Sequence, residues 1–119
     1  MRPRSAWVCS VLLSALAGPG CGGTTACPND LPAQCPAPVP SYAASVSGIL
    51  DRRCGSGCHE PGGVAADRPL TDYADVYRQR SAVLNQAYAC AMPPAGAPAL
   101  RSDERAQLFG WLVCGAPDN

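Results

Sequence analysis

The sequence predicts an all-α fold, a small domain of three main helices. Three stretches carry apolar residues at helical spacing, and each has a polar N-cap candidate before it and a chain break after it. Pro- and Gly-rich segments separate these stretches, and no part of the chain has a convincing strand pattern. The expected helices cover residues 41–53, 71–89 and 103–114.

The first 20 residues have the features of a signal peptide. Arg2 and Arg4 give a positive start, and the apolar run of residues 6–17 is too short to cross a bilayer as a helix. Cys21 follows several small residues and resembles the lipid-bearing cysteine of bacterial lipoproteins. The alternative is an ordinary cleaved signal that leaves Cys21 free or paired. In both cases we expect a protein in the periplasm or on the outer surface, where disulfides form.

Composition limits what the rest of the chain can be. The 119 residues have a formal net charge of zero, and all nine basic residues are arginine, so nothing indicates nucleic-acid binding. Residues 21–40 contain five prolines and no helical period, which predicts a flexible tether. Residues 41–119 form the expected domain, and with so few aromatic residues it needs disulfides, a metal or a large cofactor as a core.

Each expected helix has a candidate for its first cap. Ser41, Thr71 and Ser102 stand directly before or at the start of the three periodic stretches. Acidic residues in the first turns of the second and third stretches suit the positive end of a helix dipole.

The only histidine of the chain stands in a distinctive position. His59 directly follows Cys58, and Cys54 lies four residues before Cys58. A pair of cysteines with histidine next to the second is typical of covalent haem attachment, in which the thiols bond the vinyl groups and the imidazole binds iron. The alternative is a Cys54–Cys58 disulfide and no haem. A zinc site is disfavoured, because the neighbours Cys58 and His59 would both have to turn toward one tetrahedral ion. A copper site normally needs two histidines, and only one is present.

Met92 is the single methionine that remains once the signal is removed. It precedes Pro93 and Pro94 in a loop between the second and third helices. A lone methionine is usually packing filler. Its occurrence together with His59 indicates instead a second axial ligand of haem iron.

Four further cysteines follow the signal. We expect a local Cys27–Cys35 disulfide in the tether and a Cys90–Cys114 disulfide between the ends of the last two helices. The sequence alone does not fix this, because six cysteines allow fifteen pairings.

These residues together resemble a family. Residues 42–119 are similar to the small single-haem cytochromes c of bacteria, in the order helix, Cys54-Gly55-Ser56-Gly57-Cys58-His59, helix, Met92-Pro93-Pro94, helix. The resemblance implies a haem c with thioether bonds to Cys54 and Cys58 and iron bound by His59 and Met92. It also implies that the first and last helices touch through Gly48 and Trp111.

The expected function is outer-sphere electron transfer in the cell envelope, between this monomer and a redox partner protein. No catalytic set appears, since the chain has no second histidine and no phosphate-binding loop, so we do not expect an enzyme. The competing expectation is a haem-free, disulfide-stapled envelope lipoprotein with a structural or interaction role.

Overall fold

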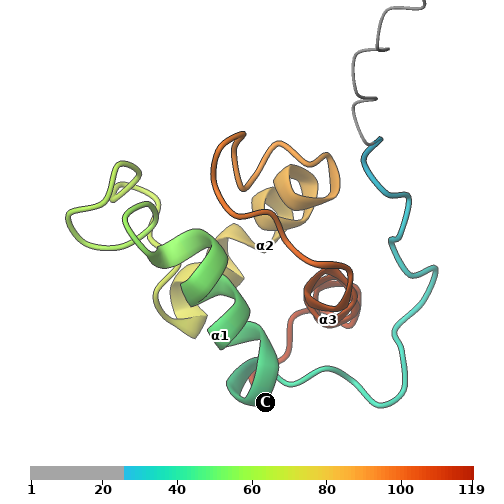
Figure 1. The fold of residues 1–119 in the computed structure, drawn as a ribbon. Helices are drawn as coiled ribbons and strands as arrows, with labels where there is room; N and C mark the ends of the chain where they lie inside the picture. The colour runs from blue at the N-terminus through green and yellow to red at the C-terminus, as the bar shows by residue number, and fades with distance from the viewer. Residues whose placement is uncertain (1–25) are drawn as a thin grey trace, which may run out of the picture.

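The structure, a computed structural model, describes residues 26–119 (Figure 1). In this part of the chain all regular structure is helical, which confirms the all-α prediction. The first helix is a continuous run of three pieces, and two longer helices follow. The elements are η1 (Tyr42–Val46), α1 (Ser47–Leu50), η2 (Asp51–Gly55), α2 (Tyr73–Tyr88) and α3 (Ser102–Val113).

The first helical run begins as the sequence predicts. Ser41 has extended backbone, and its side chain accepts a hydrogen bond from the amide of Ala44. The run opens and closes with wider π-type turns, η1 and η2, around one ordinary α-helical turn. It ends at Gly55, directly beyond Cys54, so this helix carries the first cysteine of the thiol pair.

The caps of the other two helices differ from the prediction. Asp72, and not Thr71, caps α2, because its carboxylate accepts from the amide of Asp75. Ser102 is the first residue of α3 and not the residue before it. The Glu104 carboxylate instead accepts from the Arg101 amide, at 3.0 Å, and so satisfies the start of this helix.

The core forms where the first helical run meets α3. The largest fully buried side chains are Trp111, Phe109, Leu50, Leu108, Val46 and Val76. The Trp111 ring lies 5.4 Å from Tyr42 and 6.4 Å from Tyr73, centroid to centroid. The predicted Gly48–Trp111 contact is wrong, because the near neighbour of Gly48 is the Arg52 side chain. Stacked aromatic rings, and not a glycine, join these two helices.

Residues 26–40 run along α3 without regular secondary structure (Figure 1). Gly110 of α3 faces Pro36 and Pro40, and an added Cβ would stand 3.0 Å from each ring. A glycine at this position therefore lets the segment lie close to the helix without displacing either proline ring.

Two disulfides fix this segment to the helical domain. Cys27 is bonded to Cys90 and Cys35 to Cys114, so all four predicted disulfide cysteines are paired. The predicted partners are wrong, however, since we expected Cys27–Cys35 and Cys90–Cys114. The C-terminal ends of α2 and α3 lie beside the N-terminal segment. Cys90 and Cys114, which follow these helices, therefore pair with cysteines that are distant in sequence.

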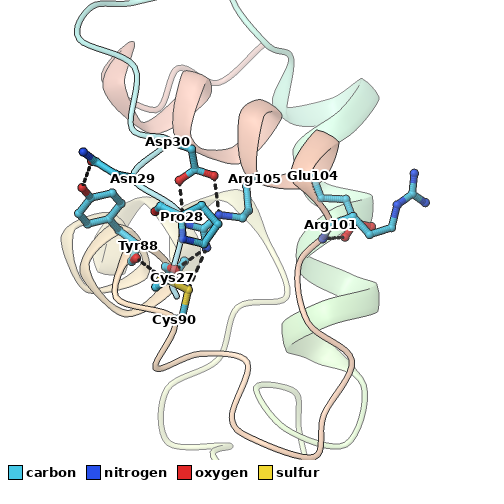
Figure 2. A network of polar contacts seen from close by, with 10 residues as sticks. Cys27, Pro28, Asn29, Asp30, Tyr88, Cys90, Arg101, Glu104 and Arg105 are labelled. Carbon is cyan, nitrogen blue, oxygen red and sulfur yellow. Dashed lines mark hydrogen bonds and ion pairs between the residues drawn. A yellow bond between two sulfur atoms is a disulfide. The ribbon is translucent and has the colours of Figure 1, made fainter. Parts of the chain in front are cut away.

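An ion pair lies beside the first disulfide (Figure 2). The guanidinium of Arg105 is buried and donates to both carboxylate oxygens of Asp30, at 2.6 and 2.8 Å. It also donates to the Ala87 carbonyl and lies over the Phe109 ring. The Arg105 hydrogen bonds hold the pKa of Asp30 below its usual value. The N-terminal segment is thus held to α3 by an ion pair as well as by covalent bonds.

The predicted signal and lipid-bearing Cys21 lie outside the described residues. Within residues 26–119, no helix has the length and apolar character that a membrane crossing requires. The division of the chain at residues 20 and 40 stays a prediction.

Candidate functional site: a thiol-lined apolar cavity

All three helical regions and two loops enclose a cavity of about 330 Å³. Cys54 comes from η2, Val83 from α2 and Leu108 from α3, while Cys58, His59 and Met92 come from the loops. This volume is at the lower end of the range for small-molecule pockets.

The loop of residues 56–72 forms one wall and is held by backbone hydrogen bonds. The Ala65 amide donates to the Cys58 carbonyl at 3.0 Å, and the Leu70 amide donates to the His59 carbonyl at 2.9 Å. Gly63 packs directly on the Cys58 backbone, and a Cβ at this position would overlap the Cys58 carbonyl. The loop therefore depends on a glycine to place the second cysteine and the histidine.

The ring of His59 is oriented by one short contact. Its Nδ1 lies 2.7 Å from the Arg68 carbonyl oxygen. A carbonyl can only accept, so Nδ1 carries the hydrogen and the neutral ring has its lone pair on Nε2. No buried side-chain N or O atom in the described part of the chain lacks a partner. Because Nε2 has no hydrogen bond in the described part, this atom is not buried, and it belongs to a residue that lines the cavity.

Cys54 and Cys58 are thiols, in contrast to the four other described cysteines. Burial, together with the smaller effect of the neighbouring Cys58, raises the pKa of Cys54 to about 11. A thiol with this pKa is protonated at neutral pH and behaves as a small apolar group.

The opposite wall carries Met92. The loop that follows α2 begins with the amides of Ala91 and Met92, which both donate to the Gln86 carbonyl. Pro93 and Pro94 line the cavity beside Met92, whose side chain is partly exposed.

Most charged or amide side chains at the cavity already have partners. Arg53 donates to the buried Glu104 at 2.8 Å, and Gln79 donates to the Pro69 carbonyl at 2.6 Å. Burial raises the pKa of Glu104, but Arg53, the Arg101 amide and Arg52 outweigh it, so the net pKa is lowered. Among the lining side chains of the described residues, His59 Nε2 and the Gln86 amide have no hydrogen bond to the protein.

The structure therefore brings Cys54, Cys58, His59 and Met92 to one cavity. Sequence reasoning missed the apolar lining that surrounds them, including Leu70, Val83 and Leu108. It also missed Gly63, for which the Gly62-Gly63 pair was the available indication. The helical spacing of apolar residues in the second and third stretches indicated buried positions but not which cavity they face.

Comparison of the chain with protein-family models, with curated proteins and with solved structures finds no match. In residues 26–119, no three His, Cys, Asp or Glu side chains form a group that could hold a metal ion. The cysteine spacer also has three residues, whereas the attachment sequence of the family has two. These findings overturn the predicted membership of the cytochromes c, together with haem binding, iron and electron transfer as descriptions of this protein.

The fold and the cavity define a different class. The described chain is a small all-α domain whose N-terminal segment is joined to it by two long-range disulfides. Its cavity is largely apolar, with two unpaired thiols and one histidine nitrogen that has no protein partner.

Proposed function

We propose that this protein is a haem-free, disulfide-stapled module of the cell envelope with an interaction role and no catalytic one. The observation that carries the proposal is the pair of disulfides, which close sequence separations of 63 and 79 residues. In the chain-entropy model, each contributes about 4 kcal/mol to the free energy of unfolding. Staples of this strength stabilise a small core that has no cofactor to pack around.

Export and anchoring belong to the same proposal. Disulfides persist outside the cytoplasm, which agrees with a signal in residues 1–20 and lipidation at Cys21. The module acts as a monomer held at a membrane by its lipid, and the apolar cavity is its point of contact with another molecule.

The test is to export the protein in two hosts, one with and one without haem-attachment machinery. We expect the same colourless, helical protein from both, with Cys27–Cys90 and Cys35–Cys114 found by mass spectrometry without reduction. A C54A/C58A variant should fold equally well in both hosts, since its disulfides are intact. A chain that folds only where haem is attached would overturn the proposal.

A further inference from the structure

The cavity also indicates what the module contacts. We propose that it binds a neutral, membrane-soluble small molecule with an apolar body and one hydroxyl group, which donates a hydrogen bond to His59 Nε2. This inference rests on the proposed envelope module and names the ligand class of its cavity.

The shape of the ligand follows from the lining. Leu70, Val83 and Leu108 surround a space of about 330 Å³. Burial keeps the Cys54 thiol protonated, and both arginines that line the cavity are in ion pairs, Arg53 with Glu104 and Arg68 with Asp67. A charged ligand would lose its hydration there without an unpaired counter-charge, whereas an apolar body gains from leaving water.

The position of the hydroxyl follows from the histidine. The Arg68 carbonyl takes the Nδ1 hydrogen at 2.7 Å and leaves Nε2 as an acceptor. Arg53 and Gln79, which also line the cavity, already donate to protein oxygens. A ligand therefore gains one hydrogen bond by offering a donor, and a ligand with only an acceptor gains none from His59.

The source of the ligand follows from chain length. Five residues separate Cys21 from Cys27, so at full extension these two Cα atoms lie at most about 22 Å apart. Cys27 is bonded to Cys90, and Met92 of the cavity wall is two residues further along. A lipid at Cys21 would hold this wall near a membrane surface, where apolar hydroxylated molecules collect.

The experiment compares two matched probes on the disulfide-bonded full chain. 4-Nonylphenol has an apolar tail and a donor hydroxyl, while 4-nonylanisole has a methyl ether in place of that hydroxyl. We expect saturable binding of both by calorimetry, with the phenol bound about tenfold more tightly, the effect of one net hydrogen bond.

Two variants test the placement. H59N retains an amide that can donate to the Arg68 carbonyl but lacks Nε2, so it should bind phenol and ether equally. A82W fills the mouth of the cavity from α2 and should abolish binding of both. S81W adds the same ring one residue earlier, where the side chain does not line the cavity, and should bind like the unmodified protein.

Circular dichroism of every variant separates the two proposals. If the protein folds with both disulfides but binds neither probe, or does not distinguish them, the ligand inference is overturned and the proposed function stands. Binding that persists in A82W also overturns it, as does a peptide partner that occupies the cavity while the phenol does not. If the chain does not fold without haem, the proposed function itself fails.

Discussion

The two sides of this molecule are held together by different means. On one side, the N-terminal segment is fixed to α2 and α3 by two disulfides and by the buried Arg105–Asp30 pair (Figure 2). On the other side, two loops around the cavity rely on backbone hydrogen bonds, and Cys54 and Cys58 remain unpaired. We infer that the disulfides and the ion pair contribute most to the free energy of unfolding. The cavity side therefore does not need to be filled with side chains for the protein to fold.

The disulfides give the largest expected effect. C35A/C114A should lower the free energy of unfolding by about 4 kcal/mol, because the unfolded chain regains the freedom that a long closed loop removes. C54A/C58A is the matched control, since it also removes two cysteines but breaks no disulfide, and it should change stability much less. Urea unfolding of both variants measures the difference. Equal losses would show that the two sides do not differ.

The Arg105–Asp30 ion pair should have the second-largest effect on the free energy of unfolding. D30N should cost about 2 to 3 kcal/mol, because the buried Arg105 then keeps its charge without a carboxylate. The folded-state pKa of Asp30 lies below the unfolded value of 3.8, so its stabilisation is present above that pH and is lost as the pH falls further. Thermal unfolding from pH 7 to pH 2 should bring the two proteins together at the acid end. A gap that stays constant would contradict this origin.

A substitution of Gly63 should destabilise the loop of residues 56–72, which forms one wall of the cavity. G63A should cost about 2 kcal/mol and weaken binding of the phenol, since the new Cβ overlaps the Cys58 carbonyl and displaces the wall. G57A is the control, because Gly57 has φ +73° but open space where the added Cβ would stand. It should cost about 1 kcal/mol from backbone strain and leave the cavity intact. Similar binding by both variants would remove the special role of Gly63.

The thiols give the smallest effect. In a C58S variant, Cys54 should react with iodoacetamide at pH 8 about tenfold more slowly than in the unfolded chain. Burial, the larger cause of the raised pKa of Cys54, remains in this variant and leaves less thiolate, although that thiolate is individually more reactive. The rate should keep rising with pH beyond 9. A plateau below pH 9 would show that Cys54 is not buried as described.

The same contrast explains how far the sequence could predict the structure. The helices followed from local patterns, because period and caps act within a few residues, and Ser41 behaves as expected. The observed N-cap of α2, Asp72, lies one residue after the predicted Thr71, because both side chains are suitable caps. Disulfide partners were missed because they depend on where α2 and α3 return to the N-terminal segment, which no local pattern encodes.

The sequence predicted four residues of the candidate site but not what surrounds them. Cys54, Cys58, His59 and Met92 were singled out by type and spacing, and the structure places all four on one cavity. The family inferred from them was wrong, because a short cysteine and histidine pattern does not specify what surrounds it. The direction of the His59 ring depends on the Arg68 carbonyl, nine residues away, and no spacing rule predicts such a contact.

The pairing of distant cysteines has a consequence for the order of assembly. A chain that crosses a membrane with its N-terminus first presents Cys27 and Cys35 together, long before Cys90 and Cys114 arrive. The bond that can form earliest is therefore one that the finished protein does not contain. Maturation then requires either that both thiols wait or that an early bond is exchanged, so the yield of native protein should depend on thiol–disulfide isomerase activity in its compartment.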